Sequence, residues 1–424
     1  MLLANFTHKE DNAVFRCFIL LLLLFLCSPP RPSAAETVKT GAEILSENGF
    51  HTLKGTRFAL VTNRSATVGG VQILEAMAKS GVQPAVIFTP EHGLEGNAED
   101  GVKLTDSSQG DIPIKSLYGA TRKPRPEDLK GLDLVLFDIQ DVGVRFYTYI
   151  STMGYAMQAA AEAGIPFVVL DRPNPLGGNY VAGFVRETKP TFTALYPIPL
   201  AHGMTVGELA EMIKGEKMLP GLSRLDLAVV TMQGWQRWMR WPDTGLPWVA
   251  TSPNLASFDS ALLYPGIGLL EGTSASEGRG SKEPFQLAGW PGIDPQALAH
   301  KLNSQGLPGL RFDPVHFTPV SLPGISSAPK FKNRDLCGVH IEITDYRNVQ
   351  PVEAGVAVMD AIYGSIQEPA RKVFFRGGLD DMAGSERVRK GVEGREPVTA
   401  IVSGWSDGIH HFLHQRQAYL LYGD

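Results

Sequence analysis

The sequence predicts an α/β protein: a Rossmann-like domain built on a parallel sheet, followed by a second, smaller α/β domain. Three observations predict this class. Short apolar stretches rich in β-branched residues alternate with stretches of helical pattern, which is typical of βαβ units. The apolar stretches are continuous, as in parallel strands that are buried on both faces. Polar residues follow directly at their ends, where open α/β sheets bind ligands.

The elements of the first domain are expected as strands with helices between them. The predicted strands are Arg57–Asn63, Pro84–Phe88, Asp133–Asp138 and Ile165–Asp171. The predicted helices are Val71–Ser80, Ser151–Ala163 and Thr205–Gly215, with Thr205 as the N-cap of the last one. Right-handed crossovers would place the carboxyl ends of the parallel strands at one edge of the sheet.

The second domain begins within a segment in which glycine, proline, aromatic and charged residues are interleaved, Ser252–Gln286. This composition predicts a fixed, non-regular segment rather than a flexible linker. Beyond it we expect a helix at Pro295–Gln305, a half-buried strand at Cys337–Asp345 and a helix at Val352–Tyr363. The predicted domains are 36–255 and 256–424, with residues 256–290 contributing to a cleft.

Composition narrows the class of protein. The 424 residues are 43% hydrophobic, enough for two cored domains, and a net charge of −5 makes nucleic acid an unexpected partner. The strand-to-helix turn after Asn63 lacks the glycine spacing of a dinucleotide site, and no phosphate-binding P-loop sequence occurs. Neither a cysteine cluster nor a close histidine pair with metal-ligand spacing is present. We therefore expect neither a cofactor nor a metal.

The amino-terminal residues predict a signal peptide. The apolar run Phe18–Leu26 is too short to span a bilayer as a helix. Small residues at Ser33 and Ala35 favour cleavage before Glu36, so residues 1–35 are expected to be removed and the mature chain to be exported to the periplasm or the extracellular space. Cleavage would leave Cys337 as the single cysteine, without an internal disulfide, and no stable membrane span.

Three predicted strands end in polar side chains. They deliver Glu91 and His92; Asp138, Gln140 and Asp141; and Asp171, Arg172 and Asn174. An aspartate at such a position can also simply cap the following turn. Because the three strand ends are expected to share one edge of the sheet, we predict a polar site there. Glu271, Glu277 and Arg279, from the glycine-rich segment, are expected to complete it, although Glu277 and Arg279 can also pair with each other in water.

Several motifs together resemble the NamZ (YbbC-like) exo-β-N-acetylmuramidases. The matching motifs are Pro90–Gly93, Asp138–Tyr149, Asp171–Gly178, His202–Thr205, Trp241–Trp248, Ser252–Asn254, Leu270–Thr273 and Ser276–Gly280. The resemblance covers nearly the whole mature chain, with departures at Leu94-Glu95, Val249–Thr251 and Ser274-Ala275. It implies a Rossmann-like catalytic domain plus an auxiliary domain that release N-acetylmuramic acid from the non-reducing ends of peptidoglycan fragments. The implied partners are peptidoglycan-derived muropeptides or amino sugars.

Glycoside cleavage needs a protonated acid at the leaving oxygen and usually a second carboxylate. Glu91 is the predicted general acid, because a carboxylic acid held against apolar walls can have its pKa raised. Asp138, Asp141, Asp171 and Glu277 compete for the second role, and the acetamido group of the substrate is an alternative nucleophile.

A larger set of residues is expected to bind the substrate. The lactyl carboxylate of a muramic acid is expected to bind a cationic side chain, and the candidates are Arg145, Arg172 and Arg279. His92, Tyr149, His202 and Asn254 are expected to hold hydroxyl groups, and Gln140, Asp141, Asn174 and Glu271 complete the predicted binding set. The main alternative function is a non-catalytic protein that binds muropeptides or amino sugars. A serine esterase or amidase is disfavoured because no GxSxG elbow is present.

Overall fold

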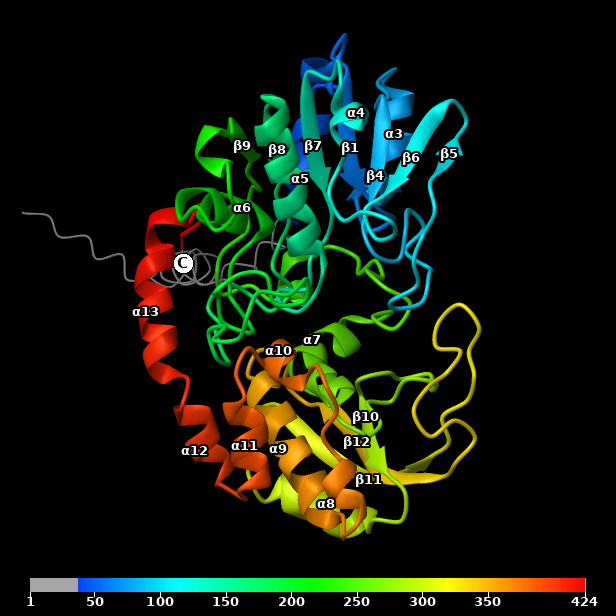
Figure 1. Cartoon of the computed structure of the whole chain (residues 1–424), viewed down its shortest axis with the longest axis vertical. Coiled ribbons are helices and arrows are strands. Elements are labelled where there is room, and N and C mark those ends of the chain that lie inside the picture. Colours follow the sequence, from blue (N-terminus) through cyan, green and yellow to red (C-terminus); the bar gives the residue numbers. More distant parts are fainter. Residues whose placement is uncertain (1–36, 424) are drawn as a thin grey trace, which may run out of the picture. The chain divides into compact units, whose positions relative to one another are not determined.

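A seven-stranded sheet forms the core of the amino-terminal half of the protein (Figure 1). The computed structural model describes residues 37–423. The strands are β1 (Phe58–Thr62), β4 (Val86–Thr89), β5 (Ser107–Gln109), β6 (Ile112–Ser116), β7 (Leu134–Asp138), β8 (Phe167–Leu170) and β9 (Leu227–Val230). Their order is β5-β6-β4-β1-β7-β8-β9, and every neighbouring pair is parallel except β5 and β6. The predicted α/β class with a mostly parallel sheet is confirmed.

Helices cover both faces of this sheet. They are α2 (Gly41–Ser46) and α3 (Ile73–Lys79) on one face, α5 (Tyr149–Ala163) and α6 (Val206–Gly215) on the other, and the short α4 (Pro126–Leu129). Alternate residues of β1 point to opposite faces: Ala59 and Val61 join the core cluster of α5 and α6, whereas Phe58 and Leu60 join that of α2 and α3. Burial on both faces explains why the strands are continuously apolar.

Local sequence signals set the ends of these helices. The hydroxyl of Thr205 accepts a hydrogen bond from the Glu208 amide, and the Glu208 carboxylate accepts one from the Thr205 amide, which completes a capping box. The predicted N-cap is confirmed.

Strand β6 was not predicted, because Pro113 lies within it and proline argues against a strand. The edge strand β9 and the short β5 were also missed.

The carboxyl-terminal half contains a three-stranded antiparallel sheet in the order β10-β12-β11, made of Leu287–Trp290, Leu336–Ile343 and Leu310–Phe317 respectively. Its helices are α7 (Phe258–Ile267), α8 (Pro295–Asn303), α9 (Pro351–Ser365), α10 (Leu379–Ala383), α11 (Arg387–Glu393), α12 (Val398–Ser403) and α13 (Ser406–Arg416). The hairpin β2 (Thr67–Val68) and β3 (Val71–Gln72) lies in the first half. The 3₁₀ helices are His51–Leu53, Leu222–Arg224, Trp241–Thr244, Gly268–Gly272, Ala370–Val373 and Gln417–Tyr419.

The prediction of a non-regular segment at Ser252–Gln286 is wrong for its middle part, which forms α7 and the 3₁₀ helix Gly268–Gly272. Pro265 and Gly266 suggested a loop, but α7 is held by packing against α9. A Cβ on Gly266 would lie 1.8 Å from the Pro351 carbonyl oxygen, so glycine permits the close approach of the two helices. Tertiary packing outweighs the low helix propensity of this stretch.

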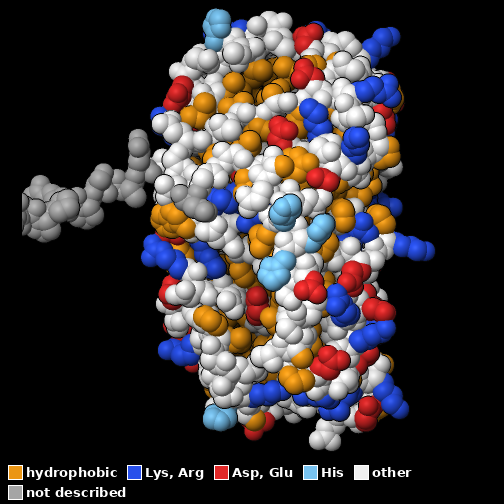
Figure 2. All heavy atoms as spheres, turned by 90° about the vertical axis from the view of Figure 1, so that its left-hand side faces the viewer, with side chains coloured by type: hydrophobic (Ala, Val, Ile, Leu, Met, Phe, Trp, Pro, Cys, Tyr) orange, Lys and Arg blue, Asp and Glu red, His pale blue; other side chains and the backbone are white. Residues whose placement is uncertain are grey.

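The end of the chain packs against the first half of the molecule. The hydroxyl of Tyr422 donates to Asp171, and the Arg416 guanidinium donates to the carbonyl oxygen of Gly203. Arg416 and Tyr422, from the second predicted domain, therefore contact residues of the first. Helix α13 carries exposed His410, His411 and His414, and histidines gather on this face in Figure 2, among interspersed acidic and basic side chains.

No helix within residues 37–423 is long and apolar enough to cross a membrane. The predicted signal peptide, residues 1–35, lies outside the described residues.

Candidate active site

The turn after β4 carries Glu91 and His92 at the carboxyl edge of the sheet. Pro90 follows the last strand residue, and His92 adopts a left-handed conformation with φ of 70°. The Glu91 carboxylate accepts hydrogen bonds from the Gly101 amide at 2.9 Å and the Thr148 hydroxyl at 2.8 Å. Glu91 is 8% exposed, and its position is fixed by a loop on one side and the start of α5 on the other.

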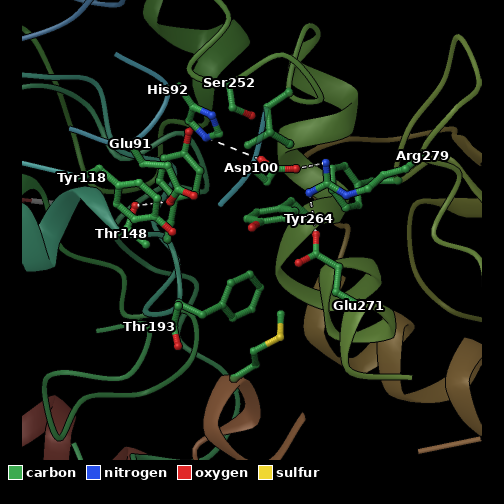
Figure 3. A pocket seen from close by; sticks show the side chains of 15 residues that line it. Glu91, His92, Asp100, Tyr118, Thr148, Thr193, Ser252, Tyr264, Glu271 and Arg279 are labelled. Carbon is green, nitrogen blue, oxygen red and sulfur yellow. Dashed lines mark hydrogen bonds and ion pairs between the residues drawn. The ribbon is translucent and has the colours of Figure 1, made fainter. Parts of the chain in front are cut away.

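Glu91 lies in the wall of a cavity of about 130 Å³, which we call the Glu91 pocket (Figure 3). Its lining combines residues of the sheet edge with residues from the α7 region and from α10. The lining residues are Glu91, His92, Asp100, Tyr118, Phe146, Tyr147, Thr148, Thr193, Ser252, Leu255, Tyr264, Glu271, Arg279, Phe285 and Met382. Glu91, His92, Glu271 and Arg279 from the predicted set thus share one pocket.

Arg279 is surrounded by carboxylates. Its guanidinium contacts Asp100, lies 2.7 Å from Glu271 and lies 3.5 Å from Glu277. Burial alone would lower the pKa of Arg279, but the carboxylates of Glu271, Asp100 and Glu277 raise it. Burial also raises the pKa of Glu271, against the opposing effect of Arg279. The guanidinium therefore stays charged and neutralises part of the acidic side of the pocket.

Glu277 stands behind Arg279 and is not among the lining residues. Its carboxylate accepts a hydrogen bond at 2.8 Å from the ammonium group of Lys330, which also donates to the carbonyl oxygens of Leu270 and Ala275. Lys330 comes from the long β11–β12 connection. Glu277 thus holds two cations in position and reaches the pocket through Arg279.

His92 connects the two sides of the pocket. Its Nδ1 lies 2.8 Å from the Ala98 carbonyl oxygen, and its Nε2 lies 3.6 Å from Asp100. Because a carbonyl oxygen only accepts, Nδ1 carries a hydrogen. Asp100 therefore lies between His92 and Arg279, as the dashed lines in Figure 3 show.

Aromatic rings form the remaining walls. Tyr147 packs edge-on against Tyr264 at 5.9 Å, and Tyr264 packs against Phe285 at 4.8 Å. Burial, followed by the Glu91 carboxylate, raises the pKa of the Tyr118 hydroxyl. Burial likewise raises the pKa of the Tyr147 hydroxyl. Both phenols are neutral at physiological pH and offer an apolar face with a polar edge to a ligand.

Asp138 and Asp171, which the sequence offered for the second catalytic role, do not line the Glu91 pocket. Asp138 is fully buried and forms a two-point ion pair with Arg172, at 2.5 and 2.9 Å. Asp171 is also fully buried and accepts hydrogen bonds from Thr205, Gly207 and Tyr422. Both carboxylates lie under the strand ends and hold the turns together. Arg172 is engaged in the ion pair with Asp138.

Other predicted binding residues also lie in the structural layer behind the pocket. Arg145 is fully buried and donates to the carbonyl oxygens of Phe184, Ile198 and Met382. Gln140 and Asn174 donate to backbone carbonyl oxygens nearby. None of these side chains lines the Glu91 pocket.

Asp141 and His202 form a buried couple in the same layer. The His202 Nε2 lies 3.9 Å from the Asp141 carboxylate. Burial raises the pKa of Asp141 to about 7, and burial followed by Arg416 and Arg145 lowers the pKa of His202 to about 3. His202 is therefore neutral in the folded protein, and neither side chain lines the pocket.

Tyr149 and Asn254 support the pocket from behind. The Tyr149 hydroxyl donates to the Thr251 carbonyl oxygen and packs against Tyr147, which is a lining residue. Asn254 donates to the Ile325 carbonyl oxygen and lies 3.4 Å from Asp100. Both side chains therefore contact residues that line the pocket without lining it themselves.

Sequence reasoning missed several lining residues, notably Asp100, Tyr118, Thr148 and Tyr264. Thr148 lies inside the Asp138–Tyr149 motif, where its neighbour Tyr149 is the expected binding residue, and Tyr264 lies within the Ser252–Gln286 segment. Asp100 follows His92 by eight positions in a polar, glycine-containing loop whose path no local pattern predicts. The loop after His92 turns back, which brings Asp100 to the wall of the pocket.

The fold and the pocket define a class of protein: a sugar hydrolase with a mixed α/β fold, whose carboxylates, histidine and aromatic walls surround one small hollow at the carboxyl edge of a sheet. Two family models then match the chain, those of the amino-terminal domain of the exo-β-N-acetylmuramidase NamZ at residues 58–259 and of its carboxyl-terminal domain at residues 262–422. The chain therefore belongs to the NamZ exo-β-N-acetylmuramidase family of glycoside hydrolases. The resemblance and the enzyme class expected from the sequence are confirmed.

Individual relatives agree with this assignment. The chain is 40% identical over 393 residues to the peptidoglycan β-N-acetylmuramidase NamZ of Bacillus subtilis strain 168, covering 91% of each chain. It is similar to two crystal structures of DUF1343 family proteins from Bacteroides fragilis NCTC 9343. The first is 35% identical with a TM-score of 0.82, over 91% of this chain and 99% of the other. The second is 34% identical with a TM-score of 0.74, over 92% of this chain and 100% of the other.

Proposed function

We propose that this protein is an exo-acting β-N-acetylmuramidase that releases N-acetylmuramic acid from the non-reducing ends of peptidoglycan fragments. One observation carries the proposal: Glu91 lies in the wall of a pocket of about 130 Å³. The Glu91 pocket is no larger than a cavity of about 150 Å³ that accommodates benzene, so it has no room for a run of sugars. The Bacillus subtilis relative, a peptidoglycan β-N-acetylmuramidase, supports the choice of sugar.

In this proposal Glu91 protonates the leaving oxygen. A hydroxyl group both donates and accepts hydrogen bonds, so Thr148 holds the Glu91 carboxyl group in place in either protonation state. Asp100 and Glu271 are the other carboxylates that line the pocket, and both face Arg279. They are suited to stabilising the positive charge that develops on the sugar ring, whether the nucleophile is a water molecule or the substrate's own acetamido group.

We further propose that the chain is exported and acts in cell-wall turnover. The apolar run Phe18–Leu26 and the small residues before Glu36 support export. Peptidoglycan lies outside the cytoplasmic membrane, so export would bring enzyme and substrate together. Mass spectrometry of the protein recovered from the outer compartment tests this: we expect an amino terminus at Glu36. Full-length protein retained in the cytoplasm would contradict export.

The activity is tested with a chromogenic β-N-acetylmuramide. We expect turnover by the wild type and a loss of about 10²–10⁴-fold in kcat for Glu91→Gln, the range attributed to a general acid. Glu95→Gln is the matched control, because Glu95 lies on the same loop with an exposed side chain. Tight binding of the sugar by calorimetry, without turnover by the wild type, would favour the alternative of a non-catalytic binding protein.

A further inference from the structure

The Glu91 pocket lacks a cation that is free for a substrate carboxylate. Among the lining side chains only Arg279 carries a guanidinium or ammonium group, and it already faces three carboxylates. Arg145 and Arg172 are engaged behind the pocket, as described above. The lactyl carboxylate that distinguishes N-acetylmuramic acid from N-acetylglucosamine therefore needs a partner that the sequence did not suggest.

Arg122 is such a partner. Its side chain is exposed, and its guanidinium lies 3.9 Å from the centre of the Phe192 ring and 5.5 Å from that of Tyr118. Among residues 37–423 no carboxylate lies within ion-pair distance of it. The adjacent cations differ: Lys123 binds both oxygens of Glu162, and Arg125 lies 3.9 Å from Glu127. Of the three cations in this loop, Arg122 alone is held by rings.

The two rings that hold Arg122 line or adjoin the Glu91 pocket, so Arg122 lies next to the pocket's lining. Tyr118 is a lining residue whose hydroxyl interacts with Glu91, and Phe192 directly precedes the lining residue Thr193. The site is also ordered. The Thr121 hydroxyl donates to the Lys123 carbonyl oxygen at 2.8 Å, and the Phe192 ring is stacked on Tyr155 at 6.1 Å.

We propose that Arg122 binds the carboxylate carried on the lactyl side of the muramic acid unit and thereby selects this sugar. The inference rests on the proposed function and assigns its substrate specificity. A guanidinium stacked on an aromatic face keeps its N–H edge free, and that edge matches a carboxylate in a two-point geometry. Two sources share this chemistry: the free lactyl carboxylate, and the carboxylates of a peptide attached to the lactyl group.

Kinetics on matched substrates test the proposal. The substrates are a chromogenic β-N-acetylmuramide with a free lactyl carboxylate, its lactyl methyl ester, and the same muramide carrying a short stem peptide. For Arg122→Gln we expect KM for the free acid to rise about 10- to 100-fold, the value of a charge-assisted hydrogen bond, with kcat nearly unchanged and the methyl ester unaffected. Arg122→Lys should retain part of the affinity, because lysine keeps the charge but not the fork. Arg125→Gln is the control and should behave as wild type.

Each outcome decides the proposal. An equal rise in KM for the acid and the ester would show a structural role for Arg122 and overturn the inference. An unchanged KM for both substrates would also overturn it. A loss on the peptide-bearing substrate alone assigns the bound carboxylate to the peptide, and a loss on the free acid alone assigns it to the lactyl group. If the wild type does not turn over the muramide, the proposed function fails. Calorimetry with N-acetylmuramic acid then tests Arg122 separately, and equal affinities of wild type and Arg122→Gln overturn it.

Discussion

Two of the guanidinium–carboxylate assemblies within residues 37–423 differ in their surroundings. The Asp138–Arg172 pair joins the ends of β7 and β8, with side chains 0% and 3% exposed. Arg279 instead sits at the wall of the Glu91 pocket among Asp100, Glu271 and Glu277, with a side chain 14% exposed. The buried pair is closed, because two acceptor oxygens meet two donor groups. The pocket cluster has more acids than cations and faces the pocket, so part of its negative charge is available to a ligand.

The largest expected effect separates the two assemblies by stability. Asp138→Asn leaves the Arg172 guanidinium buried without its charge partner, which should lower the free energy of unfolding by ~3–5 kcal/mol. Denaturant titration followed by circular dichroism measures this. The control is Asp106→Asn, which breaks the exposed pair with Lys115 and should cost less than ~1 kcal/mol. If Asp138→Asn were as stable as wild type but no longer turned over substrate, the buried pair would serve activity and the contrast between the two assemblies would be wrong.

The next effect is on activity. Glu271→Gln keeps the size of the side chain and leaves Arg279 with two carboxylates, so the fold should survive. We expect kcat/KM on the chromogenic muramide to fall about 10²–10³-fold, as when one preorganised electrostatic group is lost from an active site. Glu283→Gln, on an exposed acid of a nearby loop, is the control. Unchanged turnover in Glu271→Gln would place Glu271 with the structural acids.

A third effect concerns the buried couple of Asp141 and His202, whose contributions to stability depend on pH in opposite directions. The pKa of Asp141 is raised to about 7 by burial, so its contribution to stability is present below pH ~4 and is lost as pH rises to 7. The pKa of His202 is lowered to about 3, first by burial, so its contribution is present above pH ~6.5 and is lost as pH falls. The two slopes oppose each other between pH 4 and 6.5.

Asp141→Asn should therefore expose the histidine slope. Relative to wild type, its free energy of unfolding should rise with pH between 4 and 6.5, by up to ~1.4 kcal/mol per pH unit. His202→Asn should show the reverse slope. Groups shared by wild type and variant cancel in this difference. Parallel pH profiles for wild type and both variants would mean that neither side chain has the shifted pKa described above.

The sequence predicted the strands that end at the site, because each is a continuous apolar run closed by a polar turn. It also placed Glu91, His92, Glu271 and Arg279 in one set. It did not separate them from Asp138 and Asp171, because an aspartate after a strand has the same local sequence whether it faces a pocket or an arginine beneath it. Asp100 and Arg122 were missed for a related reason: their roles depend on loop paths and on rings 70 residues or so away, as with Phe192.

The smallest effect concerns a contact at the border of the pocket cluster. The Glu99 carboxylate, next to Asp100, accepts hydrogen bonds from the amides of Gly324 and Ser327 and from the Ser327 hydroxyl. The Ser327 hydroxyl first of all lowers the pKa of Glu99, so the contact is present above the usual pKa of a glutamate and weakens as pH falls below it.

Because the contact is near the surface, Glu99→Gln should change the free energy of unfolding by less than ~1 kcal/mol. Its effect should instead be local: faster amide hydrogen exchange in residues 318–335 and a KM raised a few-fold, since the adjacent Asp100 would be held less firmly. Glu95→Gln again serves as control. If exchange in 318–335 were unchanged, the Glu99 contact would not hold this loop, and the order of the pocket cluster would have to come from Lys330, which binds Glu277 from the same loop.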